Sequence, residues 1–234
     1  MIFLKLSNIL NDINKVLLPP LCFGCNARLY RGEHLLCTLC RNQLPLTEYN
    51  FMTENPVDRI FYGRTDVSKA AAFLYYHEDG IVKNLIHYLK YRKQQQLGTF
   101  LGEWFGQDLM EAGLPAIPDY IIPVPLHPRK QRQRGYNQVD NFGKALARVM
   151  GSEFRTGLLL KTANVRTQTR KDRFFRWQSQ QELYTLADGE ELRGKKVLLV
   201  DDVITTGATL EACSLALQKA GDVEVYIAAM AVVP

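Results

Sequence analysis

Two common nucleotide-binding motifs are absent from this sequence of 234 residues. It contains neither the G-x-x-x-x-G-K-[ST] pattern of a P-loop nor the G-x-G-x-x-G pattern of a dinucleotide-binding turn, so neither type of site is expected. No run of about 18 apolar residues occurs, and we therefore expect no membrane-spanning helix. The N-terminal stretch also lacks the uninterrupted apolar core and the A-x-A cleavage site of a signal peptide, so export is not expected.

Histidine is scarce, with four residues in the chain. His77 and His87 lie near aromatic residues without partners at metal-ligand spacing, so we assign them no catalytic role. Hydrophobic residues make up 47% of the sequence and charged residues 23%, which is the profile of a soluble globular protein. The net charge of +5 is a mild excess, so the distribution of the cations is more informative than their sum.

Four of the five cysteines form two C-x-x-C pairs, and the candidate metal ligands are Cys22, Cys25, Cys37 and Cys40. Two such pairs can place four thiolates tetrahedrally around one Zn²⁺. Disulfides would need an oxidising compartment, and a redox C-x-x-C would need only one pair, so we favour structural zinc. The metal would stabilise a ribbon too small to bury its own core, and the residues leave open whether that ribbon also binds nucleic acid or protein. Cys213 is expected in the core.

The sequence predicts four segments. An amphipathic helix over residues 1–20 is expected to pack on the protein, with a membrane surface as the weaker alternative. The zinc ribbon follows at 21–45, a connector at 46–66 and an α/β domain at 67–234. Within that domain, predicted strands alternate with predicted helices, which favours a parallel sheet with helices on both faces. The expected strands are 70–76, about 119–125, 154–160, 182–186, 197–200 and 223–232. The expected helices are 80–90, 97–112, one around 142–149 and one that opens after Thr209, with apolar residues at Leu210, Cys213, Leu217 and Ala220.

The most informative stretch runs from Val197 to Thr209, with the sequence VLLVDDVITTGAT. Its four apolar residues predict a strand buried on both faces, and Asp201 and Asp202 stand at the predicted end of that strand. A turn rich in Thr and Gly at a helix start offers N–H groups, hydroxyls and the positive end of the helix dipole to a phosphate. Carboxylates suit sugar hydroxyls or hydrated Mg²⁺. The residues therefore predict a site for a phosphorylated ribose.

The same stretch resembles the signature of type I phosphoribosyltransferases, which bind 5-phosphoribosyl 1-pyrophosphate (PRPP) with Mg²⁺. The resemblance implies a type I phosphoribosyltransferase fold in which Asp201 and Asp202 bind the ribose 2′- and 3′-hydroxyls as the catalytic acid pair. It also implies that the following loop holds the 5′-phosphate. The residues of the PRPP-binding loop are Val203, Ile204, Thr205, Thr206, Gly207, Ala208 and Thr209.

Two further segments are candidates for the pyrophosphate and for a mobile hood over the site. The resemblance places the pyrophosphate loop after the 119–125 strand, and it places the hood between the 154–160 strand and the signature strand. The candidate residues are Pro125, Leu126, His127, Arg129, Lys130, Arg166 and Arg170. Cations interleaved with aromatics in the hood also suit single-stranded DNA, because they can contact phosphates and stack on bases.

Taken together, the four-cysteine ribbon, the PVPLHP and RGYNQ motifs, the RTQTR hood and the signature resemble the ComF family (ComFC and GntX proteins) along nearly the full chain. The family is bacterial and cytoplasmic, and it is associated with natural competence and use of external DNA. One departure lies in the hood, where family members commonly carry Arg-x-x-Asn and this chain has Arg173-Phe-Phe-Arg176.

Two main hypotheses follow. The first is a PRPP-binding phosphoribosyltransferase, a pentosyl-group glycosyltransferase whose acceptor the sequence does not specify, linked to DNA uptake. The second is a non-catalytic accessory factor that binds single-stranded DNA, works with other competence proteins and keeps the PRPP site as a sensor. A metal-ribbon interaction protein is a third, weaker reading.

Overall fold

The computed structural model describes residues 19–161 and 183–234. Almost all of the predicted N-terminal helix therefore lies outside the described residues, as do the hood candidates Arg166 and Arg170. None of the helices within the described ranges has the length and apolar character needed to cross a membrane.

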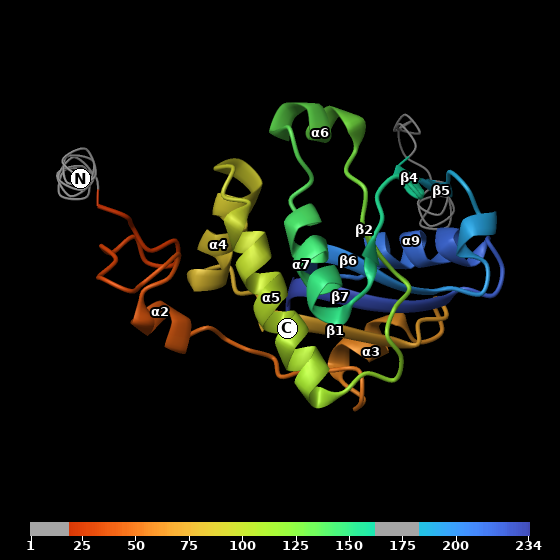
Figure 1. Ribbon diagram of the computed structural model, residues 1–234, viewed down its shortest axis with the longest axis horizontal. Coiled ribbons are helices and arrows are strands. Elements are labelled where there is room, and N and C mark those ends of the chain that lie inside the picture. Colours follow the sequence, from red (N-terminus) through yellow and green to blue (C-terminus); the bar gives the residue numbers. More distant parts are fainter. Residues whose placement is uncertain (1–18, 162–182) are drawn as a thin grey trace, which may run out of the picture.

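A five-stranded sheet forms the centre of the molecule, and every neighbouring pair of its strands is parallel (Figure 1). The strand order is β1-β7-β6-β2-β3, which confirms the predicted α/β fold class. The strands are β1 (Lys69–Tyr75), β2 (Tyr120–Pro123), β3 (Glu153–Phe154), β6 (Lys196–Ile204) and β7 (Glu224–Val232).

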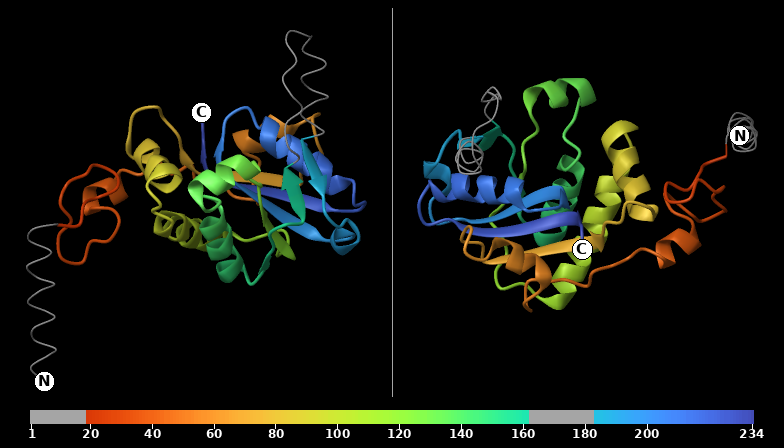
Figure 2. Two further views of the ribbon diagram at one scale, coloured as in Figure 1. Left: turned by 90° about the horizontal axis from the view of Figure 1, so that it is seen from above. Right: turned by 180° about the vertical axis from the view of Figure 1, so that it is seen from behind.

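Helices cover both faces of this sheet, as the continuous apolar strands predict (Figure 2). One core receives Leu198 and Val200 of β6, and the other receives Val197 and Leu199, because successive side chains of a strand point to opposite faces. On the first face lie α4 (Ile81–Tyr91), α5 (Gln96–Ala112) and α7 (Asp140–Met150), and on the second lie α3 (Pro56–Phe61) and α9 (Ala208–Gln218).

Two predicted strands differ from the structure. The single strand expected at 154–160 is two short strands, β3 and β4 (Leu159–Lys161), separated by Gly157 in a left-handed conformation (φ +85°). β4 leaves the main sheet and pairs antiparallel with β5 (Tyr184–Leu186). The strand expected at 197–200 continues to Ile204 in β6, because β7 still pairs with it there. The acid pair consequently lies inside the strand.

The segment predicted as a connector, 46–66, contains the short helix α3, which the sequence analysis missed. Asn55 caps this helix by accepting a hydrogen bond from the Val57 amide at 2.9 Å, and Asp58 accepts from the Asn55 amide at 3.0 Å. Asp58 also accepts from the Ala70 amide of β1 at 2.8 Å. This capping box, with Pro56 at the first helical position, is a local signal from which α3 is predictable.

Three other short helical elements were not predicted. They are α2 (Thr38–Asn42), α6 (Pro128–Arg134) and the 3-10 turn η1 (Glu190–Leu192). All three span fewer than eight residues, too short to show the apolar periodicity on which helix prediction depends.

The cysteine-containing segment lies at one end of the molecule, next to α4 (Figures 1 and 2). Asn84 of α4 donates to the Gly24 carbonyl at 2.7 Å, and the Tyr88 hydroxyl donates to Asn26 at 2.7 Å. Arg41 lies over the Trp104 ring of α5, 5.2 Å from its centroid. The segment is therefore docked on two helices that also pack against the sheet.

Candidate functional site

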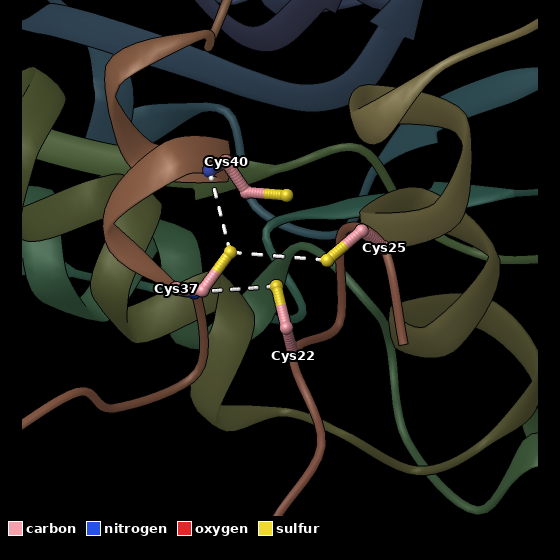
Figure 3. Close-up of side chains that lie close together, drawn as sticks. All are labelled: Cys22, Cys25, Cys37 and Cys40. Atoms are coloured by element: carbon pink, nitrogen blue, oxygen red, sulfur yellow. Dashed lines mark hydrogen bonds between the residues drawn. The ribbon is translucent and has the colours of Figure 1, made fainter. Parts of the chain in front are cut away.

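The four predicted metal ligands meet at one point (Figure 3). Their sulfur atoms all lie within 4.8 Å of one another, and the sulfurs of Cys25 and Cys37 are 3.8 Å apart. A tetrahedral Zn²⁺ with Zn–S bonds of about 2.3 Å requires sulfurs about 3.8 Å apart, so the donor set fits this metal. All five cysteines are free thiols in the structure, so none of the four ligands is in a disulfide.

Backbone amides point at the sulfurs of this cluster. The Cys22 sulfur accepts from the amides of Gly24 at 3.3 Å and Cys37 at 3.2 Å, and the Cys37 sulfur accepts from the Cys40 amide at 3.4 Å. Such donors stabilise thiolates. A Cβ atom at Gly24 would lie 2.8 Å from the Cys40 sulfur, so the turn admits only glycine without rearrangement. The residues are thus arranged for a closed, four-thiolate structural site.

The second cluster surrounds the acid pair on β6. β2 pairs with β6 only as far as Pro123, opposite Val200. Asp201 and Asp202 therefore follow the point where β6 loses this neighbour, and they border a crevice of about 670 Å³. Their carboxylates point to opposite faces of the sheet, since they are adjacent residues of one strand.

Asp202 is buried and hydrogen-bonded on both oxygens. Lys90, at the end of α4, donates to Oδ1 at 2.8 Å, and Gln138 donates to Oδ2 at 2.6 Å. Arg134 in turn donates to the Gln138 side-chain carbonyl. The sequence alone did not decide whether Lys90 has a functional role. It is the counterion of Asp202, and the two residues are 112 positions apart in the chain.

Asp201 has a different environment on the other face. Burial, together with the negative charge of Asp202, raises the pKa of Asp201 to about 7, although the Asp202 amide donates to its carboxylate at 2.8 Å. Lys161 and Tyr184 line the crevice beside it. The Lys161 ammonium donates to the Tyr184 hydroxyl at 2.8 Å, and burial lowers the pKa of this lysine below its usual value. Sequence analysis assigned no role to Tyr184.

The loop after β6 leads directly into α9. Gly207 precedes the first residue of the helix with φ +73°, and a Cβ atom there would lie 2.6 Å from a methyl carbon of Ile60. Both the conformation and the close approach require glycine. The N-cap residue of α9 is this glycine, which has no side chain to cap the first turn, so the amides of that turn can face an anion. Thr205, Thr206 and Thr209 are exposed around this turn.

Arg64 holds the loop from the side, a role that the sequence did not reveal. Its guanidinium donates to the Thr206 carbonyl at 2.8 Å and to the Ile60 carbonyl at 2.9 Å. It also forms an ion pair with the buried Glu211 in the first turn of α9, with Nε 3.0 Å from the carboxylate. Since Glu211 would repel an anion at this helix start, Arg64 both orients the loop and neutralises the acid.

The pyrophosphate candidates within the described residues line the same crevice. Pro125, Leu126 and His127 connect β2 to α6, and the exposed Arg129 and Lys130 begin that helix. His127 accepts from the Arg129 amide through Nδ1 at 3.2 Å, so its neutral form carries the proton on Nε2. Within the described ranges, that buried Nε2 has no hydrogen-bond partner.

The structure thus brings most predicted site residues to one crevice, but not all of them. Val203 continues β6, and the Ile204 side chain is buried in the sheet core. Of the predicted phosphate loop, Thr209 is the residue that lines the crevice. The described lining consists of Lys90, Val124, Pro125, Leu126, His127, Arg129, Lys130, Gln133, Arg134, Gln138, Lys161, Tyr184, Asp201, Asp202 and Thr209.

Comparison with known proteins gives one matching family model, described as Phosphoribosyl transferase domain, over residues 141–232. The chain is 36% identical over 112 residues to Competence protein F of Haemophilus influenzae, which covers 47% of this chain and 49% of that protein. It is 24% identical over 225 residues to the DNA utilization protein YhgH of Escherichia coli strain K12, which covers 89% of this chain and 95% of that protein.

Among solved structures, the glutamine PRPP amidotransferase of B. subtilis aligns with a TM-score of 0.45 and 19% identity, over 62% of this chain and 30% of that chain. The match covers 49% of Competence protein F and 63% of the DNA utilization protein YhgH of Salmonella typhi. The chain therefore spans less than two thirds of the length of these curated relatives. The transferase domain ends with β7, and the described residues before it hold the four-cysteine cluster. The matching transferase domain, the relatives named for competence and DNA utilization, and the four-cysteine cluster support assignment of the chain to the ComF family of phosphoribosyltransferase-like proteins.

Proposed function

We propose that the crevice binds PRPP together with Mg²⁺. The observation that carries this proposal is the placement of two carboxylates on opposite faces of β6, followed after five residues by the start of α9, whose N-cap is a glycine without a side chain. Asp201 and Asp202 would accept hydrogen bonds from the ribose hydroxyls, and the residues from Thr205 to Thr209 would bind the 5′-phosphate.

If the protein is an enzyme, the reaction is displacement of pyrophosphate from ribose C1 by an acceptor nucleophile. Mg²⁺ would supply neutralisation of the departing pyrophosphate when bound. The chain's own part is to orient the ribose through the acid pair and to present Arg129 and Lys130 toward the leaving anion. Asp202, already fixed by Lys90 and Gln138, would hold its position without rearrangement.

We also propose that the four-cysteine cluster holds Zn²⁺ in a structural role. Four thiolates complete its coordination, so the ion would stabilise the fold of residues 21–45 and leave no position for a substrate. Cys22, Cys25, Cys37 and Cys40 would be its ligands.

Calorimetric titration of PRPP, with and without Mg²⁺, tests the ligand. Wild type is expected to bind in a Mg²⁺-dependent manner, and D201N/D202N is expected to lose that binding. The matched control, D66N/D79N, removes the same charge from acids outside the crevice and should bind like wild type. Equal affinity of wild type and D201N/D202N would refute the assignment of the acid pair.

A role in DNA uptake or use of external DNA is the physiological context we propose, in the cytoplasm and alongside other competence proteins. The names of two relatives, Competence protein F and DNA utilization protein YhgH, support it. One observation favours direct contact with single-stranded DNA: α6 exposes Arg129, Lys130 and Arg132 without a carboxylate within 4.0 Å in the described part of the chain.

The alternative function, a non-catalytic DNA-binding factor, is tested by salt dependence. Under this alternative, R132A should weaken binding of an oligothymidine and reduce its salt slope by about one. The same result is expected of R170A/W177A in the predicted hood. If the salt dependence of oligothymidine binding is unchanged in both variants, neither α6 nor the predicted hood contacts DNA. The PRPP-binding proposal would then stand without DNA binding at these segments.

A further inference from the structure

The acid pair of the crevice has counterions that the protein itself supplies. The Lys90 ammonium donates to Oδ1 of Asp202 at 2.8 Å, and the two side chains are 23% and 9% exposed, so this ion pair is largely removed from water. Lys161 is near enough to Asp201 that its positive charge opposes the rise in the pKa of that carboxyl group. Each carboxylate of the pair is therefore under the influence of a lysine.

The position of Lys90 is fixed by contacts at the end of α4. Lys90 lies in the last turn of this helix, where the helix dipole favours a cation. The Tyr136 hydroxyl donates to the Leu89 carbonyl, and the Arg134 guanidinium lies over the Tyr91 ring, 5.4 Å from its centroid. These contacts tie the helix end to the segment where α6 ends, so the fold holds the Lys90 ammonium at Asp202.

A further cation stands behind the same carboxylate. Gln138 donates to Oδ2 of Asp202 at 2.6 Å, and its own side-chain carbonyl accepts from Arg134. A divalent ion on Asp202 would therefore lie close to the Lys90 ammonium and near the Arg134 guanidinium, and like charges repel strongly at such distances inside a protein. A hydroxyl group meets no such repulsion, because a carboxylate has about four lone-pair positions and Lys90 and Gln138 occupy two of them.

We propose that Lys90 takes the place of a metal ion at the acid pair, so that the ribose end of the ligand binds without Mg²⁺. The inference rests on the proposed PRPP site and restricts the need for Mg²⁺ to ligands that carry the diphosphate. Lys90 is a positioning residue in this scheme, because it acts on the ribose through Asp202. A phosphoribosyl group that has lost its diphosphate would stay bound after the metal has left.

The first test is calorimetric titration of ribose 5-phosphate and of PRPP, each with and without added Mg²⁺. Wild type should bind ribose 5-phosphate with affinities that agree within about twofold in the two conditions, whereas PRPP should bind only with Mg²⁺. The matched control is K83M, which removes a half-exposed lysine of the same helix that lies 3.7 Å from Asp79, outside the crevice. K83M should behave like wild type.

The second test is K90M, which leaves the buried Asp202 carboxylate without its counterion. Such a group takes up a proton or another cation. Without Mg²⁺, the affinity of K90M for ribose 5-phosphate should fall about tenfold. With Mg²⁺, the affinity should return to within about threefold of wild type, because the ion now replaces the ammonium. If the melting temperature shows that K90M does not fold, K90Q replaces it.

The double variant K90M/D202N removes the carboxylate as well as the lysine. Its affinity for ribose 5-phosphate should be low in both conditions, because no acid remains there for Mg²⁺ to bind. Comparison of K90M with K90M/D202N therefore locates the rescuing ion at Asp202.

A requirement for Mg²⁺ in the binding of ribose 5-phosphate by wild type would overturn the inference. So would a K90M variant that binds like wild type without Mg²⁺, or one whose loss Mg²⁺ does not relieve, and so would a rescue that persists in K90M/D202N. Failure of the proposed function looks different: wild type would then bind PRPP no better than D201N/D202N, with or without Mg²⁺.

Discussion

The cysteine cluster and the ligand crevice are built in opposite ways. The four sulfurs come from residues 22–40 and meet within 4.8 Å of one another. The crevice collects residues from Lys90 to Thr209, carried by α4, α6, β4, β5, β6 and α9. The first site depends on one short piece of chain, whereas the second exists only when the whole sheet and its helices are assembled.

The two regions also differ in how completely their polar groups are paired. Amides donate to the sulfurs of Cys22 and Cys37, and the four sulfurs surround a single point. In the described part of the crevice, both carboxylate oxygens of Asp202 accept hydrogen bonds from other side chains, whereas Asp201 accepts one from a backbone amide and Lys161 donates one. A closed set of ligands suits a permanent ion, and incompletely paired groups suit a ligand that enters and leaves.

Loss of a cysteine ligand should give the largest effect and should stay confined to the first region. C37S is expected to lose its zinc and the fold of residues 21–45, because structural Zn²⁺ contributes about 10 kcal/mol or more in zinc-finger peptides. Elemental analysis and hydrogen exchange measure both losses. C213A is the control, since Cys213 is buried in the other core and should leave the metal in place. A full zinc content in purified C37S would show that Cys37 is not needed to hold the metal, and the description of the cysteine cluster as a closed site would be wrong.

The pH dependence of Asp201 should give the next largest effect, in the second region. Its pKa is about 7 when folded against 3.8 otherwise, so the folded protein binds this proton more tightly than the unfolded chain. The contribution to stability is therefore present below about pH 4, is lost as the pH rises to about 7 and is constant above that value. Each tenfold difference in proton affinity corresponds to about 1.4 kcal/mol.

D201N removes that titration. Its free energy of unfolding, measured with urea between about pH 5 and about pH 8, should gain on wild type as the pH rises, because wild type loses stability over this interval. D79N, at an exposed acid, should follow the wild-type pH dependence. Parallel curves for D201N and wild type would show that the Asp201 carboxylate ionises at its ordinary pKa.

A pair of glycines tests how tightly the phosphate loop is packed. Gly207 and Gly151 both have φ +73°, but a Cβ atom would lie 2.6 Å from Ile60 at the first and would meet nothing within 4 Å at the second. G151A should cost about 1 kcal/mol through backbone strain alone, and G207A should cost more because α3 must move. Thermal unfolding measures the difference. Equal costs would mean that α3 yields freely and does not hold the loop.

The smallest effect is expected where the two regions meet on α4. Y88F removes the hydrogen bond to Asn26 and should destabilise the docked segment by about 1 kcal/mol. Zinc transfer to a chelator should then be a few-fold faster, and PRPP affinity should be unchanged. Y62F, at an exposed tyrosine, is the control. If Y88F loses PRPP affinity as well as zinc, α4 couples the two regions through Lys90. The cysteine cluster and the crevice would then not be independent sites.

The sequence predicted the parts that depend on neighbouring residues. Strands β1 and β7, helices α4 and α5, and the clustering of the cysteines follow from apolar periodicity or from short spacing. Asp201 and Asp202 line a crevice, and β6 extends beyond them.

The contacts that complete the crevice were not predictable in this way. Gln138 reaches Asp202 across 64 positions, and Arg64 reaches Glu211 across 147. Nothing in the local pattern around Arg64 or Tyr184 separates them from any surface arginine or buried tyrosine. These partners are set by strand order and helix packing, which a single sequence does not encode in its periodicity.

The alternation of side chains along β6 makes strand register a safeguard for the site. Leu198 pairs with Ile121 of β2 and with Tyr226 of β7, and this register sends Asp202 toward Lys90 and Asp201 toward the opposite face. A slip of one residue would exchange the two carboxylates and turn the leucines of β6 to the wrong cores. A misassembled molecule would thus lose ligand recognition and core packing together, so quality control by chaperones and proteases could remove inactive copies without any separate sensor of activity.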